Sequence, residues 1–303
     1  MNRTYDALDA PVSGGLLRAG RWTSSATTSP PPSSGPLVLA LHGVTANHLA
    51  WGRVAELTSY DVVAPDLRGR GRSSSLQGPA GMAAHAADLA ALLDHLEVER
   101  ALVVGHSMGG FVATAFHEAH PDRVSDVVLV DGGLPLPPMP EGMSTDDAIA
   151  AIIGPAAERL SMTFADAEAY FDFWKQHPAL GPWWSREVEA YFAYDLVGQP
   201  PHCRSSVSLA AVREDSADLL DGSLVADRAA ALPAGTVFLR AVNGMMDEPG
   251  GLYPSALVEQ HAASYPGLDL RDVDGVNHYT LVMGSGAQAV ADTVAAVATR
   301  GSR

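Results

Sequence analysis

A serine flanked by glycines is the feature of this sequence best suited to chemistry. Ser107 is the centre of a Gly-His-Ser-Met-Gly segment at 105–109, after the apolar run 101–104 and before a helix-like segment at 108–119. A Gly-x-Ser-x-Gly segment between a strand and a helix forms a sharp turn that exposes the serine hydroxyl, and only small neighbours fit beside it. The segment therefore predicts a nucleophile elbow with Ser107 as the nucleophile.

A serine nucleophile needs a histidine that takes its proton and a carboxylate that holds the histidine in the right tautomer. His278 follows the last apolar run, 268–273, and precedes a predicted helix at 285–299. A residue in that loop emerges at the carboxyl edge of a parallel sheet, where Ser107 is also expected. The sequence therefore predicts His278 as the catalytic base.

Two aspartates compete for the role of the triad carboxylate. Asp247 follows the apolar run 236–242 through a glycine turn and gives the chain order Ser, Asp, His. Asp131 ends the run 127–130, so it also reaches the carboxyl edge and also precedes the histidine. We favour Asp247 on chain order, keep Asp131 as the alternative, and regard Glu248 as a third candidate.

The tetrahedral intermediate of acyl transfer carries an oxyanion, which two backbone N–H groups can stabilise. One is expected from Met108, the residue after the nucleophile, at the start of a helix. The other is expected from Val44, in the loop after the apolar run 37–41. His42 is expected to order this loop by hydrogen bonding, with no role in proton transfer.

The elements that must position these residues are short apolar runs alternating with helical segments. Two opening strands are expected at 5–11 and 15–23. The apolar runs lie at 37–41, 61–64, 101–104, 127–130, 236–242 and 268–273, and the helical segments at 81–96, 108–119, 254–265 and 285–299. Strands that are apolar on both faces are typical of a mostly parallel sheet covered by helices. The sequence therefore predicts an α/β fold.

This alternation stops after residue 133 and resumes near 233. We expect residues 1–133 and 233–303 to form the α/β core and residues 134–232, called here the cap segment, to form an inserted helical lid. The cap segment is rich in aromatic residues, and such side chains can line a wall for a bulky, neutral, aromatic substrate. The candidate substrate-binding residues are Phe171, Trp174, Trp183 and Tyr191.

Composition narrows the choice of partners. The formal net charge of −16 over 303 residues disfavours nucleic acid and anionic membranes, so we expect a small-molecule substrate. Cys203 is the only cysteine, which excludes an internal disulfide and a zinc–thiolate site. We expect no metal or organic cofactor. The first residues lack the pattern of a secretory signal, and the cytoplasm is the expected location.

Four motifs together resemble those of the α/β-hydrolase superfamily. In chain order they are His-Gly at 42–43, Asp66–Ser73, Gly-His-Ser-Met-Gly at 105–109 and Asn-His at 277–278. The resemblance implies an eight-stranded, mostly parallel sheet, a helical cap between strands six and seven, and a serine–histidine–acid triad. In this family the usual acid position corresponds to Asp247, whereas some members use the position of Asp131.

The resemblance also narrows the reaction. Haloalkane dehalogenases and epoxide hydrolases of the family need a carboxylate where this chain has Ser107, so the resemblance implies hydrolysis of a carboxylic ester or lactone. Carbon–carbon bond hydrolases and cofactor-free haloperoxidases share the serine triad and are alternatives. A ligand-binding protein that keeps the fold without turnover is the alternative outside enzymology.

Overall fold

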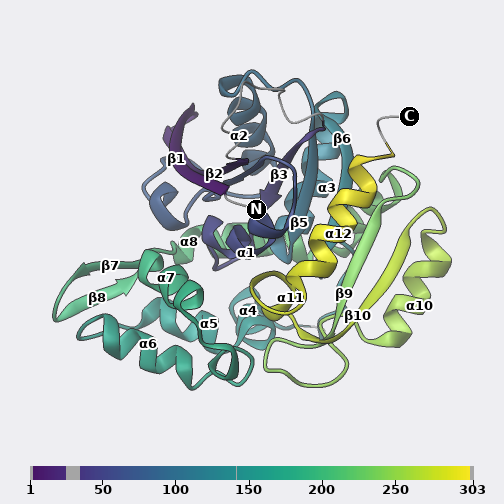
Figure 1. Ribbon diagram of the computed structural model, residues 1–303. Coiled ribbons are helices and arrows are strands. Elements are labelled where there is room, and N and C mark those ends of the chain that lie inside the picture. Colours follow the sequence, from purple (N-terminus) through teal and green to yellow (C-terminus); the bar gives the residue numbers. More distant parts are fainter. Residues whose placement is uncertain (1–2, 25–34, 141, 301–303) are drawn as a thin grey trace.

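The computed structural model describes residues 3–24, 35–140 and 142–300, and its centre is an eight-stranded sheet (Figure 1). The strands, in spatial order, are β1 (Arg3–Val12), β2 (Gly15–Ser24), β4 (Val62–Pro65), β3 (Leu37–Leu41), β5 (Ala101–His106), β6 (Val124–Val130), β9 (Val237–Asn243) and β10 (Asp269–Asn277). β1 pairs antiparallel with β2, and β2 with β4, while the pairings from β4 to β10 are parallel. The predicted α/β fold with a mostly parallel sheet is confirmed.

Helices cover both faces of this sheet, and each face has its own hydrophobic core. The helices outside the cap segment are α1 (Gly52–Leu57), α2 (Met82–His95), α3 (Met108–Ala119), α10 (Ser255–Ser264), α11 (Thr280–Met283) and α12 (Ala287–Ala298). α2, α3 and α10 pack on one face, whereas α1, α11 and α12 pack on the other. None of the helices in the described ranges is long and apolar enough to cross a bilayer.

The chain leaves the sheet between β6 and β9. Its elements there are α4 (Thr145–Ile153), α5 (Pro155–Glu158), α6 (Ala167–Lys175), α7 (Arg186–Asp195), β7 (Leu196–Gln199), β8 (His202–Ser205), α8 (Leu209–Leu220) and α9 (Gly222–Ala230). β7 and β8 form an antiparallel hairpin, so the segment is not purely helical. Helices α5 to α7 and this hairpin project at the lower left of Figure 1.

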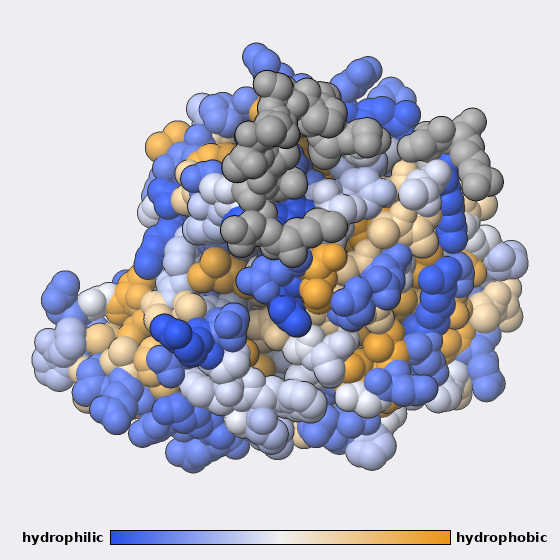
Figure 2. Space-filling view, viewed as in Figure 1, coloured by the Kyte–Doolittle hydropathy of each residue, from blue (hydrophilic) through white to orange (hydrophobic). Residues whose placement is uncertain are grey.

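Packing divides the cap segment into two parts. Its aromatic residues build a third hydrophobic core, to which Trp174 and Phe192 belong. α9 instead buries Val225 and Ala229 in the core around α3. This last helix therefore packs against α3, while the predicted boundary at 232 includes it in the cap segment. Hydrophobic residues are interspersed with hydrophilic ones on the face seen in Figure 2.

Candidate active site

Ser107 lies in the turn between β5 and α3, with φ 55° and ψ −125°. Residues other than glycine rarely adopt a positive φ, so this value marks local strain in the backbone. Glycines flank the turn because there is no room for a Cβ: one added at Gly105 would lie 2.1 Å from the carbonyl oxygen of Gly109, and one at Gly109 would lie 2.1 Å from that of Leu41. The geometry is that of a nucleophile elbow.

His278 follows β10 directly, and its Nδ1 lies 2.7 Å from Oδ2 of Asp131. Both side chains are buried. The backbone N–H of Ala241 on β9 donates to the other carboxylate oxygen, Oδ1, at 3.2 Å. Asp131 itself has φ 49°, so it shares the positive φ of Ser107. An ionised carboxylate at this distance holds the proton of His278 on Nδ1 and leaves Nε2 free to accept another.

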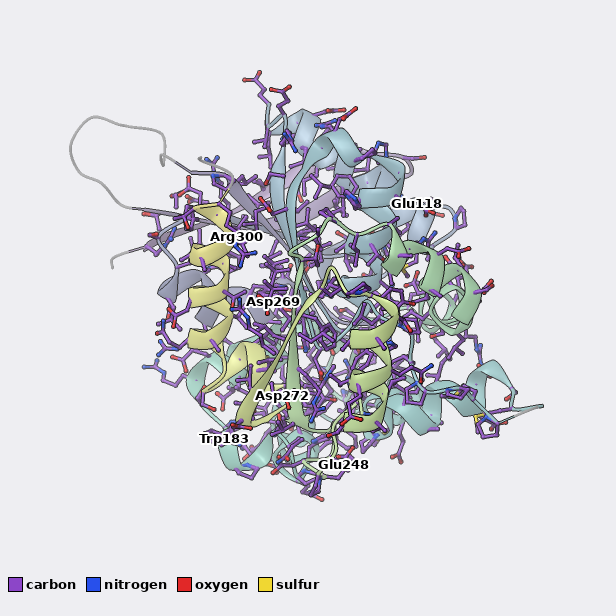
Figure 3. All side chains as sticks on the ribbon, turned by 90° about the vertical axis from the view of Figure 1, so that its right-hand side faces the viewer. Glu118, Trp183, Glu248, Asp269, Asp272 and Arg300 are labelled. Carbon is purple, nitrogen blue, oxygen red and sulfur yellow. The ribbon has the colours of Figure 1, made fainter. Side chains whose placement is uncertain are left out.

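The structure places the competing carboxylates elsewhere. Oδ1 of Asp247 accepts hydrogen bonds from the side-chain amides of Asn243 (3.0 Å) and Asn277 (3.2 Å). Oε2 of Glu248 accepts the backbone N–H of Met246. Glu248 is labelled near the lower edge of the molecule in Figure 3. Of the three candidate acids, the one hydrogen-bonded to His278 is therefore Asp131, the alternative to the acid that chain order favours.

His106 holds the backbone of His278 in place. Its ring packs against the ring of His278 with a centroid distance of 4.5 Å, and its Nε2 donates to the carbonyl oxygen of His278 at 2.9 Å. Burial, with the nearby His278, keeps the pKa of His106 well below the usual range. A neutral His106 with its proton on Nε2 thus supports the base without competing for protons.

The loop after β3 brings a second peptide group to the nucleophile. A Cβ added at Gly43 would lie 3.5 Å from Oγ of Ser107, so this loop passes directly beside the hydroxyl. Nδ1 of His42 donates to the carbonyl oxygen of Gly43 (2.8 Å), while its Nε2 accepts the N–H of Leu67 (2.9 Å). Because His42 holds this C=O on one side, the trans peptide points the N–H of Val44 the opposite way.

Met108 is the first residue of α3, and the first N–H groups of a helix have no acceptor within the helix. Together with Ser107, Val44 and Met108 line one cavity of about 50 Å³. The two predicted oxyanion donors and the nucleophile are therefore gathered around one space. Burial also sets the protonation state of His42. It lowers the pKa of His42 to about 3, so the imidazole that orders the loop is neutral.

Two small cavities meet at Ser107. The remaining walls of the first are mainly aliphatic and are formed by Phe111, Leu136, Ile149, Ile152, Ile153, Ser216, Leu219, Leu220 and Leu252. The second, of about 30 Å³, is shared with His278 and Tyr191. No lysine or arginine lines either cavity in the described part of the chain.

Of the four candidate substrate-binding residues, the structure brings Tyr191 to the nucleophile. Trp174 is buried in the core of the cap segment and stacks on Phe192 at 4.4 Å. Phe171 packs near Trp184 in the same core. Trp183 is 45% exposed, and Figure 3 shows it near the lower edge of the molecule.

The aliphatic wall was missed in reading the sequence, although it had a signal. Ile149, Ile152 and Ile153 have the i, i+3, i+4 spacing that places side chains on one face of a helix. That face of α4 points at the nucleophile. The leucines from α8 carry no such signal, because their place in the cavity beside Ser107 depends on how the cap segment packs.

A family model described as the alpha/beta hydrolase fold matches residues 36–201. The chain belongs to this family, as its fold and motifs predict. It is 42% identical over 106 residues to lipase LipV of Mycobacterium tuberculosis (strain ATCC 25618 / H37Rv), covering 35% of this chain and 40% of that one. It is 41% identical over 105 residues to epoxide hydrolase B of the same strain, covering 33% and 30%.

These matches span only about a third of the length of the curated relatives. Similarity of fold extends further. The solved structure of E-2-(acetamidomethylene)succinate hydrolase superposes with a TM-score of 0.75 at 20% identity, covering 96% of this chain and all of that one. The chain therefore has the fold of the α/β-hydrolase family over nearly its whole length, and its reaction and substrate are separate questions.

Proposed function

We propose that this protein hydrolyses carboxylic esters or lactones that have a short, slim, aliphatic acyl group. The observation that carries the proposal is the hydrogen bond between His278 and Asp131, with His278 and the elbow serine lining one cavity and Val44 and Met108 lining another with that serine. This arrangement fits acyl transfer through a serine ester. Ser107 also stands where the family's epoxide hydrolases and haloalkane dehalogenases need a carboxylate, which speaks against those reactions.

In the proposed mechanism, Oγ of Ser107 attacks the substrate carbonyl carbon while Nε2 of His278 takes the hydroxyl proton. The carbonyl electron pair moves to oxygen, where the N–H groups of Val44 and Met108 stabilise the charge. Collapse of this intermediate breaks the bond to the leaving alcohol, which takes the proton from His278. Water then attacks the acyl-enzyme, giving one proton to His278, and the second collapse returns that proton to Ser107 and releases the acid.

The two cavities suggest the orientation of the substrate. His278 must reach the leaving oxygen and lines the smaller cavity, so the alcohol belongs on that side. The acyl chain then occupies the aliphatic cavity beside Val44 and Met108. That space is far below the roughly 300–1,000 Å³ of sites for drug-sized ligands, which favours a short chain over a bulky aromatic group.

The expectation of an aromatic substrate thus loses the support of most of the residues on which it depended. An anionic substrate, as the carbon–carbon hydrolase alternative requires, would gain from a cation beside Ser107. The described residues that line the two cavities include no lysine or arginine. A neutral ester or lactone fits these walls better.

The test is hydrolysis of p-nitrophenyl acetate, butyrate, octanoate and benzoate by the wild type, Ser107→Ala and Ser125→Ala. Ser125 is near the start of β6, at the opposite end of the strand from Asp131, and serves as the matched control. We expect turnover of the short aliphatic esters, its loss in Ser107→Ala and its retention in Ser125→Ala. A folded wild type that turns over none of the esters, or activity that survives in Ser107→Ala, would refute the proposal.

A further inference from the structure

Two buried arginines hold successive carbonyl groups of the loop after β3. Nε of Arg70 donates to the carbonyl oxygen of Val44 at 2.8 Å. Nη2 of Arg159, which comes from the cap segment, donates to the carbonyl oxygen of Thr45, also at 2.8 Å. Both arginines are almost completely buried. A buried guanidinium is costly unless it is paired, so each of these arginines needs a buried counter-ion to stay in place.

Arg70 contacts both of the proposed oxyanion residues. Besides its bond to Val44, its Nη2 lies 3.6 Å from the sulfur of Met108. His42 fixes the peptide plane before Val44, and Arg70 fixes the plane after it. With both planes held, the direction of the Val44 N–H is determined.

The charge of Arg70 is balanced by a carboxylate of the cap segment. Asp215 on α8 forms a fully buried ion pair with it. Asp215 also accepts the N–H of Gly81 (2.7 Å) and faces Nε2 of His85 (3.0 Å). Its burial raises the pKa of the carboxyl, but Arg70 and His85 outweigh this and hold that pKa far below the usual range. The cap segment thus supplies the counter-ion for a core arginine at the oxyanion loop.

The charge of Arg159 is balanced within the cap segment. Asp195, at the end of α7, lies 3.4 Å from its Nη2, and Nε of Arg159 lies 3.0 Å from the hydroxyl of Tyr170. That hydroxyl donates to Asp195 at 2.5 Å. The hydroxyl of Ser206 donates to the other oxygen of Asp195. This network fixes the guanidinium that reaches across to Thr45.

We propose that Arg70 and Arg159 are positioning residues that hold the oxyanion loop, residues 43–45, through their partners Asp215 and Asp195 in the cap segment. The consequence is that the oxyanion hole is complete only when the cap segment is seated on the core. This inference rests on the proposed serine hydrolysis, because the loop matters only if it stabilises an oxyanion. Arg70, Arg159 and their two carboxylate partners are not among the described residues that line the aliphatic cavity where the acyl group would bind.

The experiment compares Asp195→Asn and Asp215→Asn with Asp88→Asn. Asp88 is the matched control: it forms a similarly buried, two-bond pair with Arg68, whose guanidinium otherwise donates to the carbonyls of Ser13 and Gln77 and reaches neither Val44 nor Thr45. We expect kcat for p-nitrophenyl butyrate to fall roughly tenfold in each test variant, with KM within about twofold. Affinity for a trifluoromethyl ketone, whose tetrahedral adduct needs the oxyanion hole, should fall in parallel.

Amide hydrogen exchange of residues 43–47 gives a readout independent of turnover. Exchange should quicken in the two test variants and remain as in the wild type in Asp88→Asn. If the wild type hydrolyses no ester, the proposed function fails, but this measurement still tests the hold on the loop. Should Asp195→Asn not fold, Tyr170→Phe keeps the ring, removes the hydroxyl between Arg159 and Asp195, and takes its place in both assays.

Equal losses of kcat and equal exchange in the test and control variants would overturn the inference, since any broken buried ion pair would then act alike. A rise in KM with unchanged kcat would also overturn it. That result would assign the two networks to substrate binding.

Discussion

Replacing Asp131 with asparagine tests which carboxylate orients the base. In the wild type, Oδ1 of Asp131 accepts the N–H of Ala241 while Oδ2 faces Nδ1 of His278. The amide oxygen of an asparagine must keep the bond to Ala241, because that partner is a donor. The NH2 group is then forced to face Nδ1, which must become an acceptor, so the histidine proton moves to Nε2.

A histidine with its proton on Nε2 cannot accept the proton of Ser107. The corresponding replacement in a serine protease lowers kcat about 10⁴-fold, which corresponds to about 5.5 kcal/mol of transition-state stabilisation. We therefore expect Asp131→Asn to lower kcat by roughly 10³–10⁴-fold with little change in KM. The side-chain volume is conserved, so the variant should still fold.

The assay is steady-state hydrolysis of p-nitrophenyl butyrate, with Asp247→Asn as the matched control. Asp247 accepts two amide N–H groups through Oδ1, and an asparagine keeps that oxygen. The control should retain activity within about threefold, in the range of a replacement that alters no catalytic contact. A large loss in Asp247→Asn together with a small one in Asp131→Asn would refute the reasoning and return the acid role to the strand-seven position.

Three further outcomes follow from particular contacts. Ile152→Trp narrows the aliphatic cavity, so the butyrate-to-acetate rate ratio should fall roughly tenfold, and an unchanged ratio would place the acyl group elsewhere. Gly132→Ala would put a Cβ 2.0 Å from the carbonyl oxygen of Ser107 and should abolish activity or folding, whereas Gly52→Ala, with open space around it, should change the melting temperature little. Burial lowers the pKa of His42 to about 3 in the folded state, below the ~6.5 of the unfolded chain, so the unfolded state binds more protons and stability falls as the pH drops from 6.5 toward 3. Urea unfolding should show about 2 kcal/mol less stability at pH 5 than at pH 7.5 from this group, and equal values would mean that His42 takes up a proton while folded.

The centre of the sheet could be predicted from the sequence because its inner strands are buried on both faces. Continuous apolar runs then coincide with strands, as at β3 (Leu37–Leu41). The end of β10 could not be predicted this way, because the strand continues to Asn277 through a register irregularity after Val273. The Asp-Gly pair at 274–275 lies within this irregularity, and in a sequence such a pair is typical of a turn.

Chain order favours Asp247 only weakly, because Asp131 also follows a strand and precedes His278. Local backbone geometry separates them. Asp131 comes directly after β6, between β5 and β9, where a carboxylate reaches the base. Asp247 lies four residues beyond β9, in a turn closed by the N–H of Gly244 and the carbonyl oxygen of Glu248. The turn carries its side chain to the amides of neighbouring asparagines.

Most of the cap-segment aromatic residues on which the substrate prediction depends lie away from Ser107, for a related reason. An insertion of about a hundred residues folded from short helices has little length over which to build a core, and large rings supply the most buried area per residue. Trp174 and Tyr170 therefore both pack on Phe192. The face of α4 left toward Ser107 is aliphatic. Aromatic density in such an insertion thus reports how the insertion is held together, and the residues that select a substrate are better sought on the helix face directed at the nucleophile.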